Sequence, residues 1–250
     1  MAKLVDLSME VSGDMVVFPR VARPIMAMLE SWEEFAENIG AAQYGAKWLT
    51  AHYVVVLGDH VGTHVDSLRH LRKDAPGPDG IPLEYCYSDG VVLDFSDKPV
   101  GYGITAEDCQ EELKRIGYTL KPLDIVLIKT GASRYNTEMR YLTDHCGMTG
   151  ESTHWLLDQG IKMVGIDAPT WDRPVRSMFE TKEFWPGHLV MVEREYYHLE
   201  ILLGAGVPIL ENLANLDAIP KPFGFKVAVF PIKWKGATAA PVRAVAILED

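Results

Sequence analysis

The chain has 250 residues, of which 48% are hydrophobic and 24% charged, and its formal net charge at pH 7 is -11. This length and composition suit a protein with one globular core, so we expect a single domain over residues 1–250. The acidic balance argues against nucleic acid and anionic membrane surfaces as partners, because both select basic patches.

Short runs rich in valine and isoleucine recur along the chain and predict β-strands. In chain order they are Leu4–Leu7, His52–Leu57, Val91–Phe95, Asp124–Lys129, Lys162–Ile166, Val207–Leu210, Phe225–Phe230 and Arg243–Leu248. The alternation of such runs with helical segments between residues 90 and 210 predicts an α/β core.

Three segments of that region predict helices. The first is Thr105–Ile116, which begins with a capping pattern and stops at Gly117. The others are Ser152–Gln159 and approximately Leu189–Leu203. Nearer the start of the chain, the stretch SWEEFAENIG looks helical in isolation, although its neighbours carry turn and strand signals.

The stretch HVGTHVDSLRH, residues 60–70, concentrates side chains that bind metals. In a helix, His60 and His64 would share a face but Asp66 would point elsewhere. In a straight strand, His60 and His64 would lie about 13 Å apart, too far to share an ion. A bend at Gly62 resolves this conflict, because glycine accepts backbone angles that other residues avoid. The spacing therefore predicts an irregular segment folded around a metal ion.

Two imidazoles and a carboxylate suit Zn²⁺, and they would also accept Mn²⁺ or Fe²⁺. His70 lies four residues beyond Asp66, so it need not be a ligand. A histidine close to metal-bound water is well suited to act as a general base. The motif differs from the HExxH pattern of helical zinc proteases, because Val61 stands where that glutamate would be.

The pattern H-x-G-T-H-x-D-x-x-x-H resembles the signature of the metal-dependent "cyclase" family, which includes bacterial kynurenine formamidases, isatin hydrolases and relatives of polyketide cyclases. The resemblance implies that His60, His64 and Asp66 bind metal and that His70 is the catalytic acid and base. It extends to DLSMEVSGDMVVFP, GIKMVGIDAPTWD and GAGVPILENL. Leu68 stands where the family often has proline. The fold implied is the family's swivelling β/β/α architecture, a mixed sheet with flanking helices.

The resemblance also implies distal ligands. Glu211, in GAGVPILENL, corresponds to a metal-binding glutamate of the formamidases. Their second-metal histidine lies about a dozen residues earlier, a count that falls on Leu199, so we predict the adjacent His198, with His188 as the alternative. Asp66 would bridge the two ions. The sequence leaves open whether one or two ions bind, and whether they are zinc or manganese.

Other polar and aromatic residues have two interpretations. Asp167 and Asp172 either orient ligands or substrate, or cap turns beside prolines. Four aromatic residues are predicted either to line a substrate pocket or to pack in the core, which is the more common place for such side chains: Trp171, Phe179, Phe184 and Trp185. The remaining histidines have no partners nearby in the sequence and are predicted to be structural: His52, His145 and His154.

These observations predict a metal-dependent hydrolase in which water attacks a carbonyl of a small amide, aryl formamide, cyclic amide or lactone. Two alternatives remain: a metal-dependent cyclase or dehydratase of a polyketide-like intermediate, and a metal- or ligand-binding protein without catalysis. The resemblance implies a homo-oligomer. The 3 cysteines without paired spacing, and the lack of a leader pattern or membrane-spanning apolar run, predict a cytoplasmic location.

Overall fold

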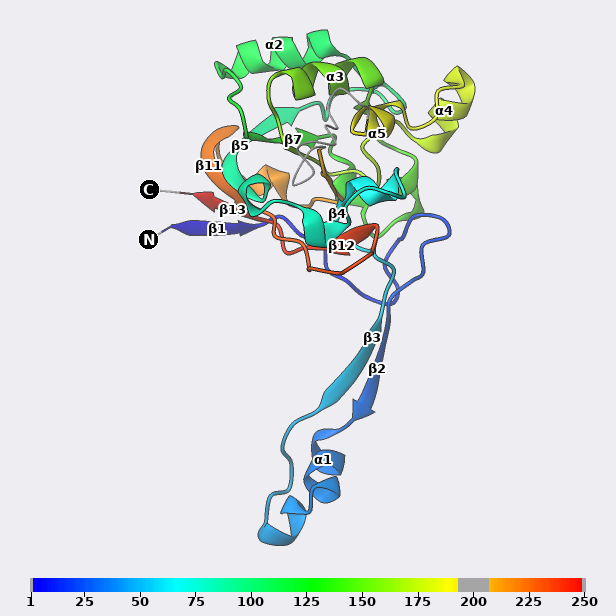
Figure 1. The fold of residues 1–250 in the computed structure, drawn as a ribbon, viewed down its shortest axis with the longest axis vertical. Helices are drawn as coiled ribbons and strands as arrows, with labels where there is room; N and C mark the ends of the chain where they lie inside the picture. Colours follow the sequence, from blue (N-terminus) through cyan, green and yellow to red (C-terminus); the bar gives the residue numbers. More distant parts are fainter. Residues whose placement is uncertain (1, 193–206, 249–250) are drawn as a thin grey trace.

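The computed structural model describes residues 2–192 and 207–248, which form a body and a long arm that projects from it (Figure 1). The body is built on a nine-stranded sheet. Its strands, in spatial order, are β1 (Lys3–Asp6), β13 (Val245–Leu248), β11 (Phe223–Ala228), β5 (Tyr87–Asp94), β7 (Ile125–Lys129), β9 (Met163–Ile166), β10 (Ile209–Glu211), β4 (His64–Asp66) and β12 (Ala239–Pro241).

The middle of this sheet is parallel and its two ends are antiparallel. Strands β5, β7, β9 and β10 run in the same direction, whereas every other pair of neighbours is antiparallel. Parallel strands are normally covered on both faces, which makes their sequences continuously apolar. Strand β7 follows this rule, since its residues 125–128, Ile-Val-Leu-Ile, are all buried.

Two helices cover one face of the sheet, α2 (Ala106–Ile116) and α3 (Gly150–Asp158) (Figure 1). Leu113 of α2 and Leu156 of α3 pack in one core cluster with Val91 of β5. A second cluster lies against the other face, where residues of the end strands, such as Val5 and Val227, pack with Leu127. The predicted α/β fold, with a mixed sheet and flanking helices, is confirmed.

Helix boundaries follow from their caps. The Thr105 side chain accepts a hydrogen bond from the backbone N–H of Asp108, and Gly117 ends α2 in the left-handed conformation. Helix α3 begins at Gly150, two residues before the prediction, because Thr149 is its cap. Helix α5 (Pro186–Val190) covers only the start of the third predicted helix, whose residues from 193 onward lie outside the described part of the chain.

Smaller elements complete the body. A two-stranded parallel sheet joins β6 (Gly103–Ile104) to β8 (Gly147–Met148), and α4 (Val175–Thr181) precedes α5. Within residues 2–192 and 207–248, every helix falls short of the length and apolar character required to cross a bilayer.

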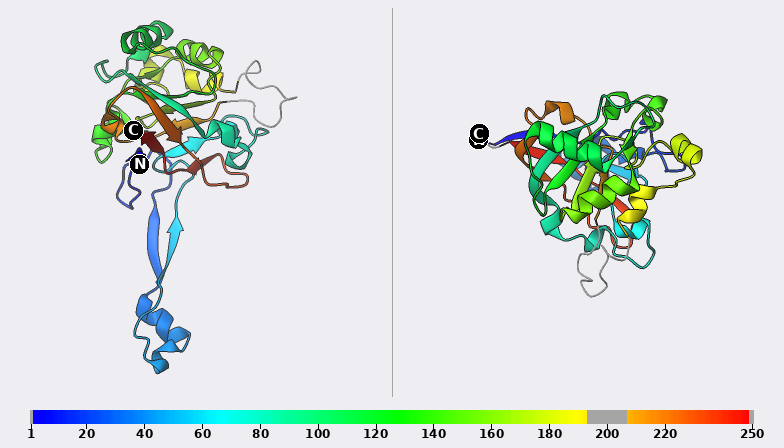
Figure 2. Two further views of the ribbon diagram at one scale, coloured as in Figure 1. Left: turned by 90° about the vertical axis from the view of Figure 1, so that its left-hand side faces the viewer. Right: turned by 90° about the horizontal axis from the view of Figure 1, so that it is seen from above.

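The arm contains an antiparallel hairpin of β2 (Ile25–Glu30) and β3 (His52–Val56). At its far end lies α1 (Trp32–Asn38), so the segment SWEEFAENIG is helical as its local sequence indicates. Ser31 and Glu34 form a reciprocal capping box at the start of α1. Two views at right angles show this arm extending well away from the body (Figure 1 and Figure 2, left).

Candidate metal centre

The segment before β4 folds back on itself, as the sequence predicts. Gly62 has a φ of 64°, in the left-handed region, and a Cβ atom there would lie 2.8 Å from Cγ2 of Val11. Any other residue would therefore meet both backbone strain and a close contact at this position. The turn directs His60 toward the side chains of His64 and Asp66.

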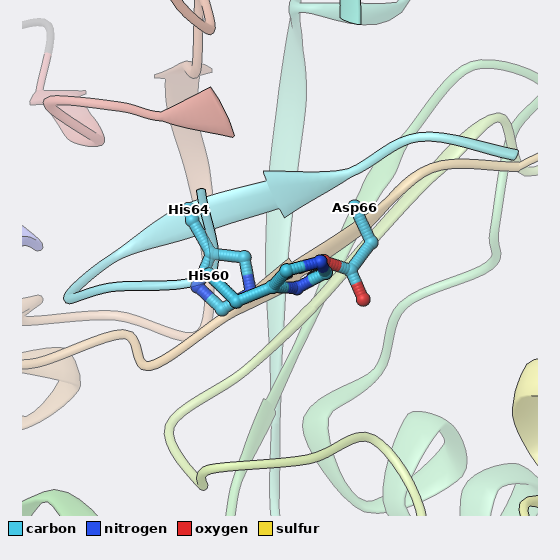
Figure 3. A group of neighbouring side chains, drawn as sticks. All are labelled: His60, His64 and Asp66. Atoms are coloured by element: carbon cyan, nitrogen blue, oxygen red, sulfur yellow. Dashed lines mark hydrogen bonds and ion pairs between the residues drawn. The ribbon is translucent and has the colours of Figure 1, made fainter. Parts of the chain in front are cut away.

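His60, His64 and Asp66 point toward one common position (Figure 3). Nδ1 of His60 lies 2.8 Å from Oδ1 of Asp66, and Nε2 of His64 lies 3.1 Å from the same oxygen. The two ring nitrogens are 3.2 Å apart. Ligands bound tetrahedrally at about 2.0–2.2 Å from zinc are separated by roughly 3.3–3.6 Å, so this triangle is close to the size that one ion requires.

The carboxylate of Asp66 shows that these residues fit a cation. Asp66 is buried, yet neither of its oxygens has a hydrogen-bond partner of good geometry among the described residues. A buried carboxylate without compensation is costly. A divalent cation between Asp66 and the two imidazoles would remove that cost.

Hydrogen bonds outside this triangle orient both rings. Nδ1 of His64 donates to the carbonyl oxygen of Gly62 at 2.9 Å, which leaves its Nε2 facing the site. Nε2 of His60 lies 3.0 Å from the hydroxyl of Thr238, and that hydroxyl donates to Asp59. His60 is therefore the donor to Thr238, and its Nδ1 faces the site. Such outer contacts fix the tautomer of metal-binding histidines.

The acidic neighbours of His64 stabilise its protonated form. Burial disfavours the charged form, but the neighbouring carboxylates of Asp66, 3.1 Å away, and Glu211 outweigh it and raise the pKa of His64 to about 9. Metal binding requires the neutral imidazole.

Glu211 reaches the site through the register of the sheet. It lies opposite His64 in the antiparallel pair of β10 and β4. Oε1 of Glu211 accepts a hydrogen bond from the backbone N–H of Trp171 at 2.7 Å, and Oε2 lies 3.8 Å from Nε2 of His64. One oxygen is thus held by the backbone while the other faces the metal-binding position.

His188, the alternative to His198, also lies in the site. Its Nε2 is 3.3 Å from Oε1 of Glu211 and 3.7 Å from Oδ2 of Asp66. Its Nδ1 lies 2.5 Å from Oδ2 of Asp172, which orients the buried ring. His198 lies outside the described residues, so its role as a ligand stays a prediction.

His70 stands at the open side of the cluster. Its Nε2 is 4.0 Å from Oδ2 of Asp66, its side chain is 36% exposed, and its ring centroid lies 4.3 Å from that of His60. Asp66, His70 and His188 form a second group whose ligand atoms lie close enough to hold an ion. The position of His70 suits either proton transfer or ligation.

A cavity of about 200 Å³ opens beside these residues. Its polar wall contains the cluster just described, and apolar side chains line the rest: Phe18, Val21, Pro169 and Trp185. Of the other predicted aromatic residues, Trp171 is buried and donates its indole N–H to Thr153. Phe179 and Phe184 are exposed and contact each other edge to face.

The contacts of the remaining polar residues show which of them reach the metal centre. Asp167 accepts hydrogen bonds from the backbone N–H groups of Thr130 and Gly131, so it caps the turn after β7. Asp172 orients His188 instead. His52 lies on the arm next to Glu30, His145 is buried with its ring donating to Cys146, and His154 is on α3. The contacts of His52 and His145 are thus with residues outside the cluster.

Sequence reasoning missed several residues around the site. Asn212 accepts a hydrogen bond from the hydroxyl of Tyr141, and its amide lies 3.3 Å from Nδ1 of His64. Its φ of 58° lies in the left-handed region, which asparagine tolerates well. The signal that the sequence offers is that Asn212 directly follows Glu211. Asp59 adjoins the motif, but Thr238 is 178 residues from His60 and has no sequence signal.

A mixed α/β fold that brings buried imidazoles and carboxylates together beside a cavity has the arrangement of a metal-dependent enzyme. Residues 5–173 of the chain match the family model described as "Putative cyclase". The match covers more than half of the 250 residues, and the chain therefore belongs to the cyclase family. This confirms the resemblance seen in the motif at residues 60–70.

Several relatives and solved structures are similar to the chain over about three quarters of its length or more. The kynurenine formamidase of Salinibacter ruber is 25% identical over 245 residues, covering 97% of this chain and 96% of that protein. The kynurenine formamidase of Bordetella avium is 23% identical, covering 76% of this chain and 78% of its own. The structure of isatin hydrolase A from Labrenzia aggregata, 24% identical, superposes with a TM-score of 0.79 over 100% of this chain and 94% of that chain, so the fold is shared.

Proposed function

We propose that this protein is a metal-dependent hydrolase. Its substrate is a small aryl formamide or cyclic aryl amide, whose amide bond it cleaves, or a related lactone, whose ester bond it cleaves. The observation that carries the proposal is the convergence of His60, His64 and Asp66 on one position, with His70 beside it. A divalent cation bound there, Zn²⁺ or Mn²⁺, would polarise a carbonyl and lower the pKa of water to about 7. His188, which lies close to both Asp66 and Glu211, is a candidate to hold a second ion together with Glu211.

His70 is the residue we assign to proton transfer. Its burial lowers the pKa, so the ring is neutral near physiological pH and can accept a proton from the attacking water. The hydroxyl then adds to the carbonyl carbon, the bond from carbon to nitrogen breaks, and the proton passes from His70 to that nitrogen. The products are an amine and a carboxylic acid, formed by adding one water, and the acid then releases a proton to become a carboxylate.

The cavity supports an aromatic substrate. Its volume of about 200 Å³ suits a single small ring system, and Phe18, Val21 and Trp185 offer apolar surface on which such a ring packs. The names of the relatives, kynurenine formamidase and isatin hydrolase, point to the same class of aryl amide.

The test is a substrate panel read by product mass. The purified protein, stripped of metal and then supplied with Zn²⁺ or Mn²⁺, is incubated with an N-formyl arylamine, isatin and an aryl lactone. We expect turnover only with metal. Isatin and the lactone should each give one ring-opened product heavier than the substrate by one water, and the N-formyl arylamine should give an arylamine and formic acid whose summed mass exceeds that of the substrate by one water. A product lighter by one water would support a dehydratase instead, and no turnover of any substrate with either metal would contradict the proposal.

A further inference from the structure

The side chain of Asn212 is held in one orientation beside the metal centre. The hydroxyl of Tyr141 donates a hydrogen bond of 2.7 Å to Oδ1 of Asn212, and Nδ2 of Asn212 lies 3.3 Å from Nδ1 of His64. If Oδ1 and Nδ2 were exchanged, the buried Tyr141 hydroxyl could donate, among the described residues, only to the sulfur of Met9 at 3.9 Å. A buried hydroxyl requires a good acceptor, so Oδ1 faces Tyr141 and the amide nitrogen faces His64.

This amide nitrogen cannot donate to the ring that it faces. Nδ1 of His64 donates to the carbonyl oxygen of Gly62 at 2.9 Å, so it carries a hydrogen and cannot also accept one. The contact of 3.3 Å between His64 and Asn212 therefore joins two donors. Asn212 also lines the cavity of about 200 Å³ beside the metal centre. Its amide hydrogens are consequently available to an oxygen atom of a molecule bound in that cavity.

Backbone contacts fix the position of this donor. Asn212 directly follows β10 and has a φ of 58°, in the left-handed region. Its N–H donates to the carbonyl oxygen of Ala168 at 3.1 Å, and its own carbonyl oxygen accepts a hydrogen bond from the hydroxyl of Thr63 at 2.5 Å. Donors that are held in place before a reaction stabilise developing charge effectively, because they need no reorganisation when the charge forms.

We propose that the carboxamide of Asn212 is a catalytic hydrogen-bond donor that stabilises the negative charge formed on the carbonyl oxygen of the substrate. The inference rests on the proposed function. As the oxygen of water bonds to the carbonyl carbon, one electron pair of the C=O bond moves onto the carbonyl oxygen. Nδ2 donates a hydrogen bond to that oxygen and keeps both of its hydrogens. The electron pair returns to the C=O bond when the bond from carbon to nitrogen breaks. Tyr141 is a positioning residue, because it acts through the orientation of Asn212.

The first test removes the donor with Asn212→Gly, which adds no charge and accepts the left-handed backbone. With Zn²⁺ and the best substrate of the panel, we expect kcat to fall by on the order of 10²- to 10³-fold while KM stays within about threefold, because the interaction forms in the transition state. The matched control is Asn215→Gly. Asn215 has a φ of 57°, and its amide donates to the backbone of Asp6, so kcat should stay within about twofold of the wild type.

The second test separates the donor from the residue that orients it. Tyr141→Phe keeps the buried ring and removes only the hydroxyl, and we expect kcat to fall about tenfold because the carboxamide of Asn212 can then rotate. Combined with Asn212→Gly, it should lower kcat by no more than about twofold beyond Asn212→Gly alone. Losses that multiply in the combined variant would contradict the positioning role of Tyr141.

The third test does not depend on turnover. Calorimetry measures the binding of benzoylformate, an aryl keto acid that resembles the ring-opened product of isatin, to the Zn²⁺-supplied protein. We expect Asn212→Gly to raise the dissociation constant about tenfold, since a hydrogen bond to a charged oxygen is lost, and Asn215→Gly to leave it unchanged. Elemental analysis should find the same zinc content in the wild type and both variants.

The outcomes distinguish this inference from the proposed function. A folded, zinc-bound Asn212→Gly variant with the kcat of the wild type would overturn the inference. Loss of zinc from that variant would also overturn it, by showing that Asn212 serves to hold His64. If the wild type turns over none of the panel, the proposed function fails, and the calorimetry still decides whether Asn212 donates to an anionic oxygen. Equal binding of benzoylformate by the wild type and Asn212→Gly, or binding by neither, would exclude that donor role.

Discussion

Strands β7 and β3 are built from similar residues but have opposite surroundings. The body strand reads Ile-Val-Leu-Ile-Lys and is buried through its first four residues, whereas the arm strand reads His-Tyr-Val-Val-Val and is exposed throughout. Both runs predict strands, and both are strands. The comparison teaches that an apolar β-rich run indicates secondary structure and a need for burial, but does not reveal whether the cover comes from the same chain.

The sharpest contrast between the two regions is a pair of His→Ala changes. His70→Ala, in the body, should reduce turnover on the order of 10²- to 10⁴-fold while the bound metal remains, because a general acid and base is lost without loss of His60, His64 or Asp66. His52→Ala, on the arm, should leave turnover within about twofold. For each variant, turnover is measured with the best substrate of the panel, and the bound metal is measured by elemental analysis. Equal activity of the two variants would remove His70 from the mechanism.

A second pair compares burial directly. Leu127→Ala removes a side chain that is 0% exposed in β7, and we expect it to lower the free energy of unfolding by about 4 kcal/mol. Leu29→Ala, at a residue 70% exposed on the arm, should cost less than about 1 kcal/mol. Urea titration of the wild type and of both variants measures the two losses. Similar losses would mean that the arm is packed within its own chain.

A third prediction concerns His145, a buried polar group of the body. Burial lowers the pKa of His145 to about 4 from 6.5. Between these values the unfolded chain takes up a proton that the folded chain does not, so this contribution to stability is complete above pH 6.5 and lost as pH falls toward 4. The upper limit of the loss is about 3 kcal/mol. Urea titrations of wild type and His145→Gln at several pH values should show a steeper decline for the wild type in this interval, and parallel declines would contradict the assignment.

Much of the fold and part of the site follow from local sequence rules. The capping pattern at Thr105 and the stop at Gly117 place α2 almost to the residue, because caps satisfy backbone groups within a few positions. The bend at Gly62 follows from the geometric conflict between His60, His64 and Asp66. Their common position could be predicted because all three lie within seven residues of the chain.

The rest of the site depends on pairing between distant strands. Glu211 meets His64 only through the register of β10 and β4, and Thr238 reaches His60 from the opposite end of the sequence. Counting along the chain favours His198, which lies outside the described residues and stays a prediction, whereas the alternative His188 lies in the site. The Asp172 side chain that holds His188 is the stronger structural signal, and it becomes visible only when the fold is known.

The raised pKa of His64 has a consequence for proton balance. At neutral pH this imidazole carries a proton before a cation arrives, and it must release that proton to become a ligand. Uptake of Zn²⁺ or Mn²⁺ should therefore acidify a weakly buffered solution, and apparent metal affinity should rise with pH below about pH 9. A pH-stat titration of the stripped protein with metal measures the protons liberated per ion, and the yield should fall when His64 is replaced by alanine.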